Sequence, residues 1–552
     1  MHLANHLGHG LSNFDATWTD TDMNAFAVWA SRIANGDLLS ADTYHPYQSW
    51  MEDVAPLETF EQWWGGRTVF HQTPLYPYLL ALSFWMTGDK ILLLLMQIAF
   101  STLTVYLIYR IGARMVDERS GLIAATLAAT YAPWIMYDTM VLRASLGVSA
   151  TVISVWLLLR VGDTGKRGLA FATGVTLAAG FLLREVGIAM MAGPLVLLLH
   201  PDARAMWKRW ALPLAAGVVL GFAPLVARNA AVHAPLLSYS TRGSETVAHG
   251  NHVGADPAFM SLPNSADYRE IMESGHGSVP RALLASIHTW PEDGQLFWWL
   301  GLEARKLHAT FRDYEYADNV NFYFFRTETP GLALLPTFGM IVGLALVGIV
   351  LMVRRGRDRT AALLLVLAAS SLLAIMLVTF ASGRYRLPLA VLATIPAGVT
   401  LSALVDWIRD RQWGPVALCA GLALLLSAAS FATVPTRILF DQSEGAHYVR
   451  GADSRLHERL TALRAREYVH EIRNRNGRGE REAAAALTVA WLADVHRTIA
   501  ETPPPESRTV RRTVINQMYL MLEWARDELQ NDGRPDLAAA VSAELDWIQQ
   551  NT

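Results

Sequence analysis

Long apolar segments recur along this chain from residue 91 onward, and short polar loops separate them. A helix that crosses a bilayer needs about 20 mostly apolar residues. Ten stretches approach this requirement, at 91–111, 121–142, 144–161, 168–183, 186–200, 210–227, 331–353, 360–381, 387–408 and 414–434. The pattern predicts an all-α polytopic membrane protein. Its transmembrane bundle of about ten spans covers residues 91–434, with a large outer loop over 228–330.

Basic residues are concentrated in alternate loops. Five connections rich in Lys and Arg centre on Arg114, Lys166, Lys208, Arg355 and Arg409. Because loops rich in Lys and Arg remain in the cytoplasm, these five are predicted to be cytoplasmic. The intervening turns, the segment 228–330 and both termini then face outward.

The apolar stretch from Thr73 to Met86 contains two prolines and is too short for a full span. It is predicted to be a juxtamembrane helix in the outer interface, within an outer loop that covers residues 1–90. Export of residues 1–72 requires a hydrophobic segment ahead of them. We therefore expect that an N-terminal transmembrane helix is missing from this chain.

Beyond residue 434 the hydropathy falls, and apolar residues recur with helical spacing. The pattern predicts helices over 455–473, 480–501, 508–530 and 534–549. Residues 435–552 are therefore expected to form a soluble all-α domain on the periplasmic side. No convincing 34-residue repeat is found, which favours a helical bundle over tetratricopeptide hairpins.

Composition agrees with a membrane protein that carries polar parts, since 52% of the 552 residues are hydrophobic and 17% are charged. The formal net charge of −3 provides no basic field, which argues against a nucleic acid partner. The single cysteine, Cys419, lies in an apolar run and excludes a disulfide within the chain.

Two carboxylates stand near the N-terminus. Asp20 and Asp22 precede the segment AFAVWASRIANGD, in which Phe26, Trp29 and Ile33 have helical spacing. A carboxylate at the boundary with water is well placed to act as a general base. Asp is also a common helix N-cap, and the spacing alone favours capping.

Further stretches follow in order along the chain. They are VFHQTPLYPYLLALSF, LVARNAAVHAPLLSYSTRGSETVAHGNHVGADP, LEARKLHATFRDYEYADNVNFYFFR and SGRYRLPL. Together with the segment from Asp22 to Asp37 they resemble the GT-C glycosyltransferases. The branch they resemble is that of the bacterial relatives of protein O-mannosyltransferases and aminoarabinose transferase. The resemblance implies a GT-C-like bundle that uses a polyprenyl-phosphate sugar as donor.

The same resemblance implies roles for individual residues. An outer-loop Asp acts as base in such enzymes, which carries over to Asp22 with Asp20 beside it. Basic residues hold the donor phosphate, which carries over to Arg384 and Arg386 at the outer end of a span. Guanidinium forks match phosphate oxygens, whereas snorkelling of Arg at a helix end is the alternative.

Other residues receive supporting roles. His71 and Gln72 stand where relatives often place a polar group against the donor phosphate, although a lone interfacial His is more often structural. Glu315 and Asn319 lie where the outer segment returns to the membrane. Glu315 contacts the acceptor or orients a base in this interpretation, and Asn319 is equally suited to capping. 

Further outward-facing polar residues are candidates for supporting the acceptor. Asp138 is a candidate second acid or metal ligand, and Arg228 and Asn251 belong to the Arg-Asn exit and the Gly-Asn turn of the resemblance. Arg184 and Glu185 are expected to form an ion pair, because charges at membrane depth usually pair.

No HxH or HExxH spacing supports a metal site, so none is assigned, and no cofactor is certain. Metal dependence varies within the GT-C class, which leaves a divalent metal open. The predicted protein is a glycosyltransferase of the bacterial inner membrane. It moves a sugar from a polyprenyl phosphate to a periplasmic protein, lipid or glycan acceptor by inverting displacement.

Two other classes of protein remain as alternatives. A non-catalytic scaffold or sensor would depend on the C-terminal domain, and Asp22 would be dispensable. A transporter would place ionisable groups near the bilayer midplane, whereas here the charges cluster at the outer ends of the spans.

Overall fold

A computed structural model describes residues 21–47, 49–258, 260, 264–275, 277–291, 293–355, 358–431, 436–441, 445–449, 463–501 and 508–551. The chain divides into two compact units. Unit 1 comprises the described parts of Met1–Asn24, Ala317–Leu334 and Ala432–Thr552. Unit 2 comprises Ala25–Tyr316 and Leu335–Phe431.

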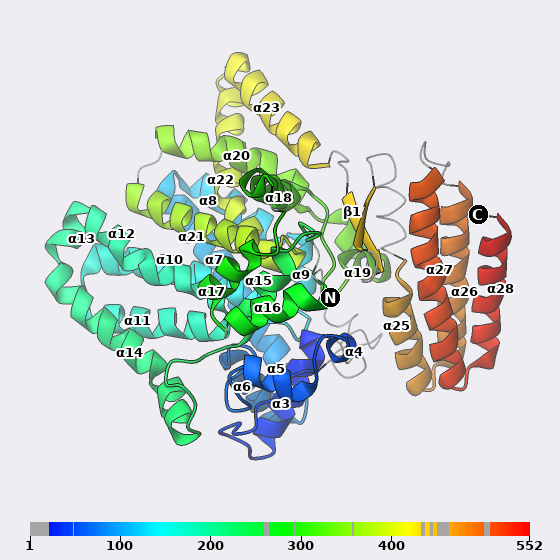
Figure 1. The fold of residues 1–552 in the computed structure, drawn as a ribbon. Helices are drawn as coiled ribbons and strands as arrows, with labels where there is room; N and C mark the ends of the chain where they lie inside the picture. The colour runs from blue at the N-terminus through cyan, green and yellow to red at the C-terminus, as the bar shows by residue number, and fades with distance from the viewer. Residues whose placement is uncertain are drawn as a thin grey trace. The chain divides into compact units, whose positions relative to one another are not determined.

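Unit 2 is built from helices (Figure 1). Most of α3 (Asp22–Ala34) belongs to it, and the shorter helices of its polar segments are α4 (Ser49–Glu52), α5 (Leu57–Trp63), α6 (Leu75–Thr87), α15 (Arg242–Gly250), α16 (Ser265–Gly275), α17 (Val279–Ile287) and α18 (Gln295–Phe311). The bundle consists of α7 (Ile91–Met115), α8 (Glu118–Ala129), α9 (Ala132–Tyr137), α10 (Ala144–Thr164), α11 (Arg167–Leu183), η2 (Glu185–Ala192), α12 (Gly193–Leu199), α13 (Pro201–Ala205), α14 (Trp207–Ala231), α20 (Phe338–Arg355), α21 (Arg359–Val378), α22 (Gly383–Arg409) and α23 (Trp413–Phe431).

Within the described residues, seven helical segments are long and apolar enough to span a membrane. They are Ile91–Met115, Ala144–Thr164, Trp207–Ala231, Pro330–Arg354, Arg359–Val378, Gly383–Arg409 and Trp413–Phe431. Each coincides with one of the ten predicted spans, which confirms the all-α polytopic class. The predicted spans 168–183 and 186–200 correspond to shorter apolar helices, Arg167–Leu183 and Met190–Leu199.

The prediction of a single span over 121–142 is wrong, because the chain forms two helices there, α8 and α9. Tyr131 adopts an extended conformation between them, and Pro133 lies in the first turn of α9. Proline has no N–H to donate, and its ring would clash with the preceding helical turn. The backbone N–H of Ala132 instead donates to the carbonyl of Pro336 at 3.1 Å.

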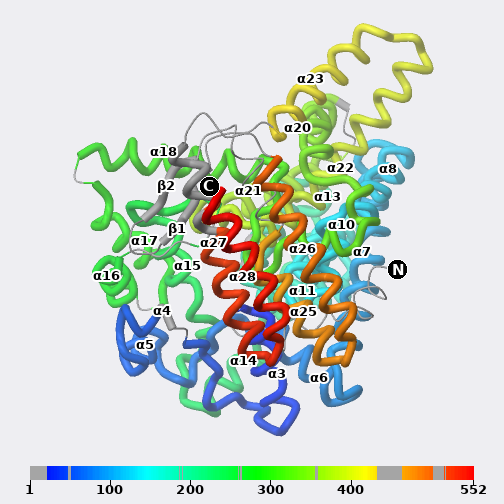
Figure 2. The backbone as a smooth tube through the Cα atoms, turned by 90° about the vertical axis from the view of Figure 1, so that its right-hand side faces the viewer, coloured from blue at the N-terminus to red at the C-terminus, as the bar shows by residue number. Residues whose placement is uncertain are grey.

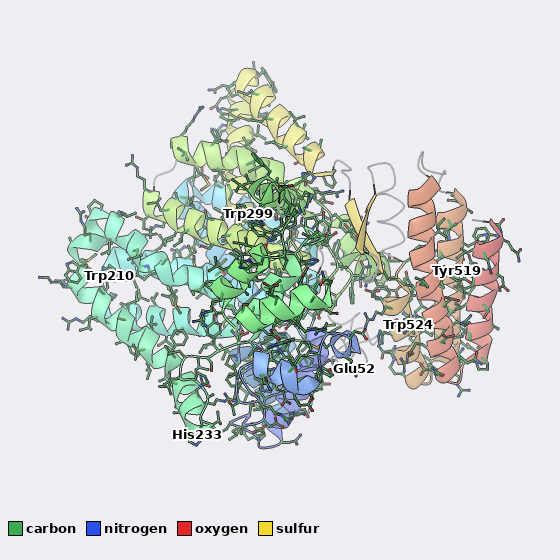
Figure 3. The ribbon with its side chains drawn as sticks, in the orientation of Figure 1. Glu52, Trp210, His233, Trp299, Tyr519 and Trp524 are labelled. Atoms are coloured by element: carbon green, nitrogen blue, oxygen red, sulfur yellow. The ribbon has the colours of Figure 1, made fainter. Side chains whose placement is uncertain are left out.

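Four of the five predicted cytoplasmic connections meet one another at one end of the unit 2 bundle. Arg114 bonds Asp163 at 2.6 Å and also pairs with Asp358, and Arg119 pairs with Asp406 at 2.5 Å. This is the arrangement that an alternating path of spans requires. Figure 3 labels Trp210 in the first turn of α14 and His233 just beyond its last turn, at opposite ends of this helix.

Two glycines bring α11 and α14 into backbone contact. A Cβ atom on Gly174 would lie 2.0 Å from the carbonyl oxygen of Leu214, and one on Gly217 would lie 2.1 Å from that of Phe171. Only glycine fits at such a crossing, and small residues are the usual means of close helix approach in membranes. The crossing fixes two helices that form walls of a cleft described below.

Unit 1 contains four long helices that lie side by side (Figure 2), α25 (Ala465–Gly477), α26 (Arg481–Glu501), α27 (Arg508–Asn531) and α28 (Pro535–Asn551). It also contains α19 (Phe322–Glu328), η3 (Pro330–Leu334) and one antiparallel hairpin of β1 (Thr436–Asp441) and β2 (Gly445–Val449), paired from Thr436↔Val449 to Asp441↔Gly445. Tyr468 and Trp491 stack at 5.4 Å in its core.

The division into units differs from the predicted domain boundaries. The sequence places the segment Ala317–Leu334 in the outer loop and the start of a span, whereas the structure groups it in unit 1 with the C-terminal helices and the N-terminal residues. Its helix α19 buries Phe322, Phe324 and Phe325. Burial of these rings favours grouping with the C-terminal helices, since Phe324 packs edge to face on Tyr468 at 5.0 Å.

Candidate functional site

Asp22 is the first residue of α3, and it contacts a residue far along the chain. Its backbone N–H donates to Asn319 Oδ1 at 2.6 Å, and Asn319 Nδ2 lies 3.3 Å from Asp22 Oδ2. Asp22 is half-buried, whereas Asn319 is buried. Asn319 therefore bonds both the backbone and the carboxylate of Asp22.

The N-cap of α3 is supplied by another residue than the sequence indicated. Thr21 Oγ1 accepts the backbone N–H of Asn24 at 3.3 Å, which is the usual geometry of a capping hydroxyl. The capping interpretation of Asp22 therefore loses its support. Asp20, the second candidate carboxylate, lies outside the described residues.

Arg386 is used within the protein. Its guanidinium donates to the carbonyls of Thr310 at 3.4 Å, Asp313 at 3.4 Å and Tyr314 at 3.1 Å, and also to that of Arg312. Arginine near a helix C-terminus commonly bonds the last free carbonyls, and α18 ends at Phe311. 

Glu315 completes this arrangement. Its Oε1 lies 2.6 Å from Arg386 Nη2 and accepts the hydroxyl of Tyr131 at 3.2 Å. Burial raises the pKa of Glu315, and the Arg386 guanidinium opposes that shift. The N–H groups of Arg386 are directed at backbone carbonyls and at the buried carboxylate of Glu315. These contacts favour a structural role for Arg386 over phosphate binding.

A cluster of three arginines lies where predicted outward turns meet. Arg184 Nη1 donates to the carbonyl of Arg384 at 3.2 Å, and the guanidiniums of both residues lie over the Tyr385 ring, at 5.1 and 5.2 Å. Arg184 is 4% exposed. Burial lowers the pKa of Arg184 to about 10, and the like charges of Arg143 and Arg384 act in the same direction.

The expected ion pair within this cluster is corrected. Glu185 pairs with Arg143, at 3.2 Å between Oε2 and Nη1, whereas Arg184 points to Arg384. Arg143 Nη1 also donates to Thr73 Oγ1 at 2.6 Å. Three guanidiniums thus lie close together, and their N–H forks match the oxygen atoms of a phosphate.

Asp138 lies beside the bundle helices α7 and α10. Its Oδ1 accepts the hydroxyl of Ser101 at 2.7 Å and also that of Ser145, and Gln97 Nε2 donates to its carbonyl at 2.9 Å. Burial raises the pKa of Asp138 to about 7, although both hydroxyls act against the shift. Its carboxyl therefore changes protonation near neutral pH.

His71 and Gln72 are both buried, and the residues around His71 form a compact aromatic and charged group. His71 packs at 5.4 Å against His45, which stacks on Trp64 at 4.6 Å. Burial lowers the pKa of His45 to about 4, so its ring is neutral at physiological pH. The deep position of His71 favours a structural role.

Arg228 and Asn251 also hold the backbone. Arg228 donates to the carbonyls of Leu39 and Thr68, at 2.8 and 2.6 Å, and lies 3.8 Å over the Phe70 ring. Asn251 Nδ2 donates to the carbonyl of Val378 at 2.7 Å, and its Oδ1 accepts Lys306 Nζ at 3.1 Å. Both residues fasten outer segments to the ends of spans.

An apolar cleft of about 500 Å³ opens between α6, α11 and α14. Its walls include Leu75, Tyr78, Ala179, Leu182 and Leu225. A predominantly apolar concavity of this size is typical of a site for a hydrophobic ligand.

Among the residues that the structure describes, no group of three or more His, Cys, Asp or Glu side chains is placed to hold a metal ion. Glu245 Oε1 lies 3.6 Å from His249 Nε2. Burial opposes ionisation of Glu245, but Arg242 and His249 hold the pKa of Glu245 at about 2.

The sequence interpretation missed the association of Arg143, Arg184 and Arg384 as one cluster, and also the cap at Thr21. Arg143 and Arg184 each follow an apolar stretch on the side that normally excludes positive charge, which was a usable signal. Thr21 directly precedes the helical spacing of α3, which is the usual position of a capping residue.

Comparisons with known proteins bear on the class. The sequence model of the family described as dolichyl-phosphate-mannose-protein mannosyltransferase matches residues 71–227. Over that segment the resemblance predicted from the sequence is confirmed. The segment includes α6 to α11 and most of α14, and with them Arg143, Arg184 and much of the apolar cleft.

Solved structures add two similar proteins. The oligosaccharyltransferase of Archaeoglobus fulgidus in the apo form has 13% identity and a TM-score of 0.38, covering 81% of this chain and 59% of that one. ArnT from Cupriavidus metallidurans, bound to undecaprenyl phosphate, has 14% identity and a TM-score of 0.34, covering 94% and 76%. The chain thus spans 59% of the length of the archaeal enzyme. No curated protein matches the chain.

Proposed function

We propose that this protein is a membrane glycosyltransferase that moves a sugar from a polyprenyl-phosphate donor to an acceptor outside the cytoplasm. The acceptor hydroxyl attacks the anomeric carbon, the bond from that carbon to the phosphate oxygen breaks, and polyprenyl phosphate leaves. A single displacement of this kind inverts the anomeric configuration. 

The observation that carries the proposal is the arginine cluster, most of which lies in the matched segment. Two of its three members, Arg143 and Arg184, lie in residues 71–227, and the description of that family names a lipid-phosphate-linked mannose. Guanidiniums stabilise the charge that develops on a departing phosphate. We assign Arg184 and Arg384 to this role, with Arg143 held beside them by Glu185.

The apolar cleft supports the lipid part of the donor. Its walls come from α6, α11 and α14, and polar groups border it only where Tyr78 and Arg228 bond the first outer segment. An isoprenoid chain would exchange lipid for such a surface at little cost, because both environments are apolar. We propose that part of the polyprenyl tail occupies this cleft.

Asp22 is proposed as the general base that removes the acceptor proton. Its carboxylate is half-buried at the first turn of α3, and Asn319 fixes its orientation. Because Thr21 caps the helix, the carboxylate is not needed for capping. A base positioned in this way contributes about 10² to 10⁴-fold to a rate.

Location follows from the predicted sidedness. We propose the bacterial inner membrane, with the reaction and the C-terminal domain on the periplasmic side. Cys419 is the only cysteine, so a Cys419→Ser chain accepts single reporter cysteines. Asp42 and Asp410 are exposed at a predicted outer and a predicted inner position. Impermeant maleimide applied to whole spheroplasts should label D42C and spare D410C.

The decisive experiment uses the full chain in proteoliposomes with a panel of polyprenyl-phosphate sugars. Transfer to an acceptor or to water is followed by mass spectrometry, and the anomeric configuration of the product is determined. Release of polyprenyl phosphate that depends on Arg184 and Asp22 supports the proposal. A chain that is folded but releases no lipid phosphate from any donor would instead be a scaffold, a sensor or a transporter.

A further inference from the structure

The short helix α19 joins the loop of Asn319 to the C-terminal helices. Asn319 contacts Asp22, and α19 begins three residues later, where Asn321 accepts the backbone N–H of Tyr323 at 3.0 Å. Asn321 and Asn319 are both buried. The chain between Asn319 and the start of α19 is therefore too short to move independently of either.

Two contacts attach α19 to the C-terminal helix α25. The ring of Phe324 meets Tyr468 edge to face at 5.0 Å, and Tyr468 stacks on Trp491 of α26. At the end of α19, Glu328 pairs with Arg475 at 3.4 Å, and Arg475 also binds Glu471 at 2.6 Å. One contact is apolar and fully buried, and the other is ionic and 12% to 15% exposed.

We propose that the C-terminal helical domain is a positioning element for the reaction, holding Asn319 against Asp22 through α19. A helix of seven residues is unstable alone, because nucleation costs more than so few hydrogen bonds return. Its order therefore depends on the surface that α25 supplies. Asn319, Phe324 and Glu328 are positioning residues in this arrangement, and Asp22 is the group that meets the substrate.

The inference deepens the proposed function and rests on it for its catalytic meaning, but the mechanical link has its own readout. Hydrogen exchange of the full-length protein is measured over residues 317–328. Phe324→Ala and Glu328→Gln remove the two attachments one at a time. Both should accelerate exchange in this segment, and the aromatic variant should have the larger effect.

A matched control lies on the same helix. Arg473 of α25 pairs with Glu528 of α27 at 2.7 Å and with Asp532, just after that helix, at 2.5 Å. Arg473→Gln therefore perturbs the domain without touching α19, and exchange over residues 317–328 should stay as in the unaltered protein. Unchanged exchange in Phe324→Ala, or an equal rise in Arg473→Gln, would overturn the link.

Catalysis is tested in proteoliposomes with the donor that supports transfer. Loss of the positioning contact should reduce kcat by about a hundredfold with little change in the donor KM, since a small misplacement of a reacting group costs that much. In an Asn319→Ala background, Phe324→Ala should cause no further loss. Additive losses would mean that α19 acts by another route.

Failure of the two proposals can be told apart. If the unaltered protein transfers no sugar but the exchange pattern responds as expected, the glycosyltransferase proposal fails and the mechanical link stands. If transfer occurs and Phe324→Ala leaves kcat unchanged despite rapid exchange, the domain has no positioning role.

Discussion

Asn319 bonds Asp22 twice across 297 positions of sequence, once at the backbone N–H and once at the carboxylate. A side-chain amide that bonds both groups restricts rotation of the Asp22 side chain. The two hydrogen bonds therefore give the Asp22 carboxylate a defined orientation. It is also the contact on which the chemical assignment of Asp22 depends.

Replacing Asp22 by Asn should lower the rate of transfer by about 10² to 10⁴-fold, because the amide cannot accept the acceptor proton. The fold should be retained, since Asn can still interact with Asn319. Turnover in proteoliposomes and thermal unfolding measure the two effects. Asp42→Asn, which alters an exposed pair with Arg67, is the control and should leave turnover intact. Full activity of D22N would remove the proposed base.

Arg184→Gln should raise the donor KM and lower kcat, because the proposed phosphate site loses its most buried cation. Arg184→Lys should recover only part of the loss, since an ammonium lacks the planar fork. Initial rates against donor concentration give both constants. Equal kinetics in R184Q and the unaltered protein would place the phosphate elsewhere.

Arg386→Gln should act on stability. Breaking a buried ion pair by removing one partner costs about 3–5 kcal/mol, because the other charge stays buried. Glu315→Gln should destabilise as well, and the double variant should lose less than the sum of the two. Thermal unfolding in detergent compares the three. A stable R386Q protein with weakened donor binding would return Arg386 to the phosphate site.

Stability should depend on pH through Asp138. Burial raises its pKa from 3.8 to about 7, so the folded protein holds a proton that the unfolded chain has released between these values. Its contribution to stability is therefore present below about pH 4 and is lost as the pH rises through 7. Asp138→Asn should flatten the fall of the unfolding temperature between pH 5 and 8, whereas Asp42→Asn should not.

A substitution that fills the apolar cleft should change the KM for a donor according to the length of its lipid tail. Ala179→Phe places a ring against α14 within the cleft and should raise the KM for a long polyprenyl donor. A short-chain analogue that reaches the arginines without filling the cleft should be affected much less. Equal effects on both donors would argue against a tail in this cleft.

Apolar periodicity predicted most of the fold because helices bury or expose residues at a fixed spacing. It placed α3 through Phe26, Trp29 and Ile33, all of which are buried. It did not predict the break at Pro133, since two short apolar helices have the same hydropathy as one span. At this position the conformational restriction of proline, and not hydropathy, determines where the helix ends.

The candidate site was harder to predict, because its contacts are set by tertiary structure. Arg384 and Arg386 look equivalent in SGRYRLPL, yet Arg386 bonds carbonyls that lie more than seventy positions earlier. Carbonyls exist at every residue, so sequence contains no sign of that partner. The grouping of Asn319 with the C-terminal helices likewise depends on where Phe324 packs.

Arg386 donates hydrogen bonds to the backbone carbonyls of Thr310, Arg312, Asp313 and Tyr314. This arrangement limits where the chain can be altered, both by engineering and in natural variants. The planar guanidinium can bond these four carbonyls only at their present spacing. Insertion or deletion of a residue between Thr310 and Glu315 would therefore leave buried carbonyls without a hydrogen-bond donor. Epitope tags and fusion partners inserted there should abolish expression. Homologous chains should differ in length on either side of this turn and agree within it.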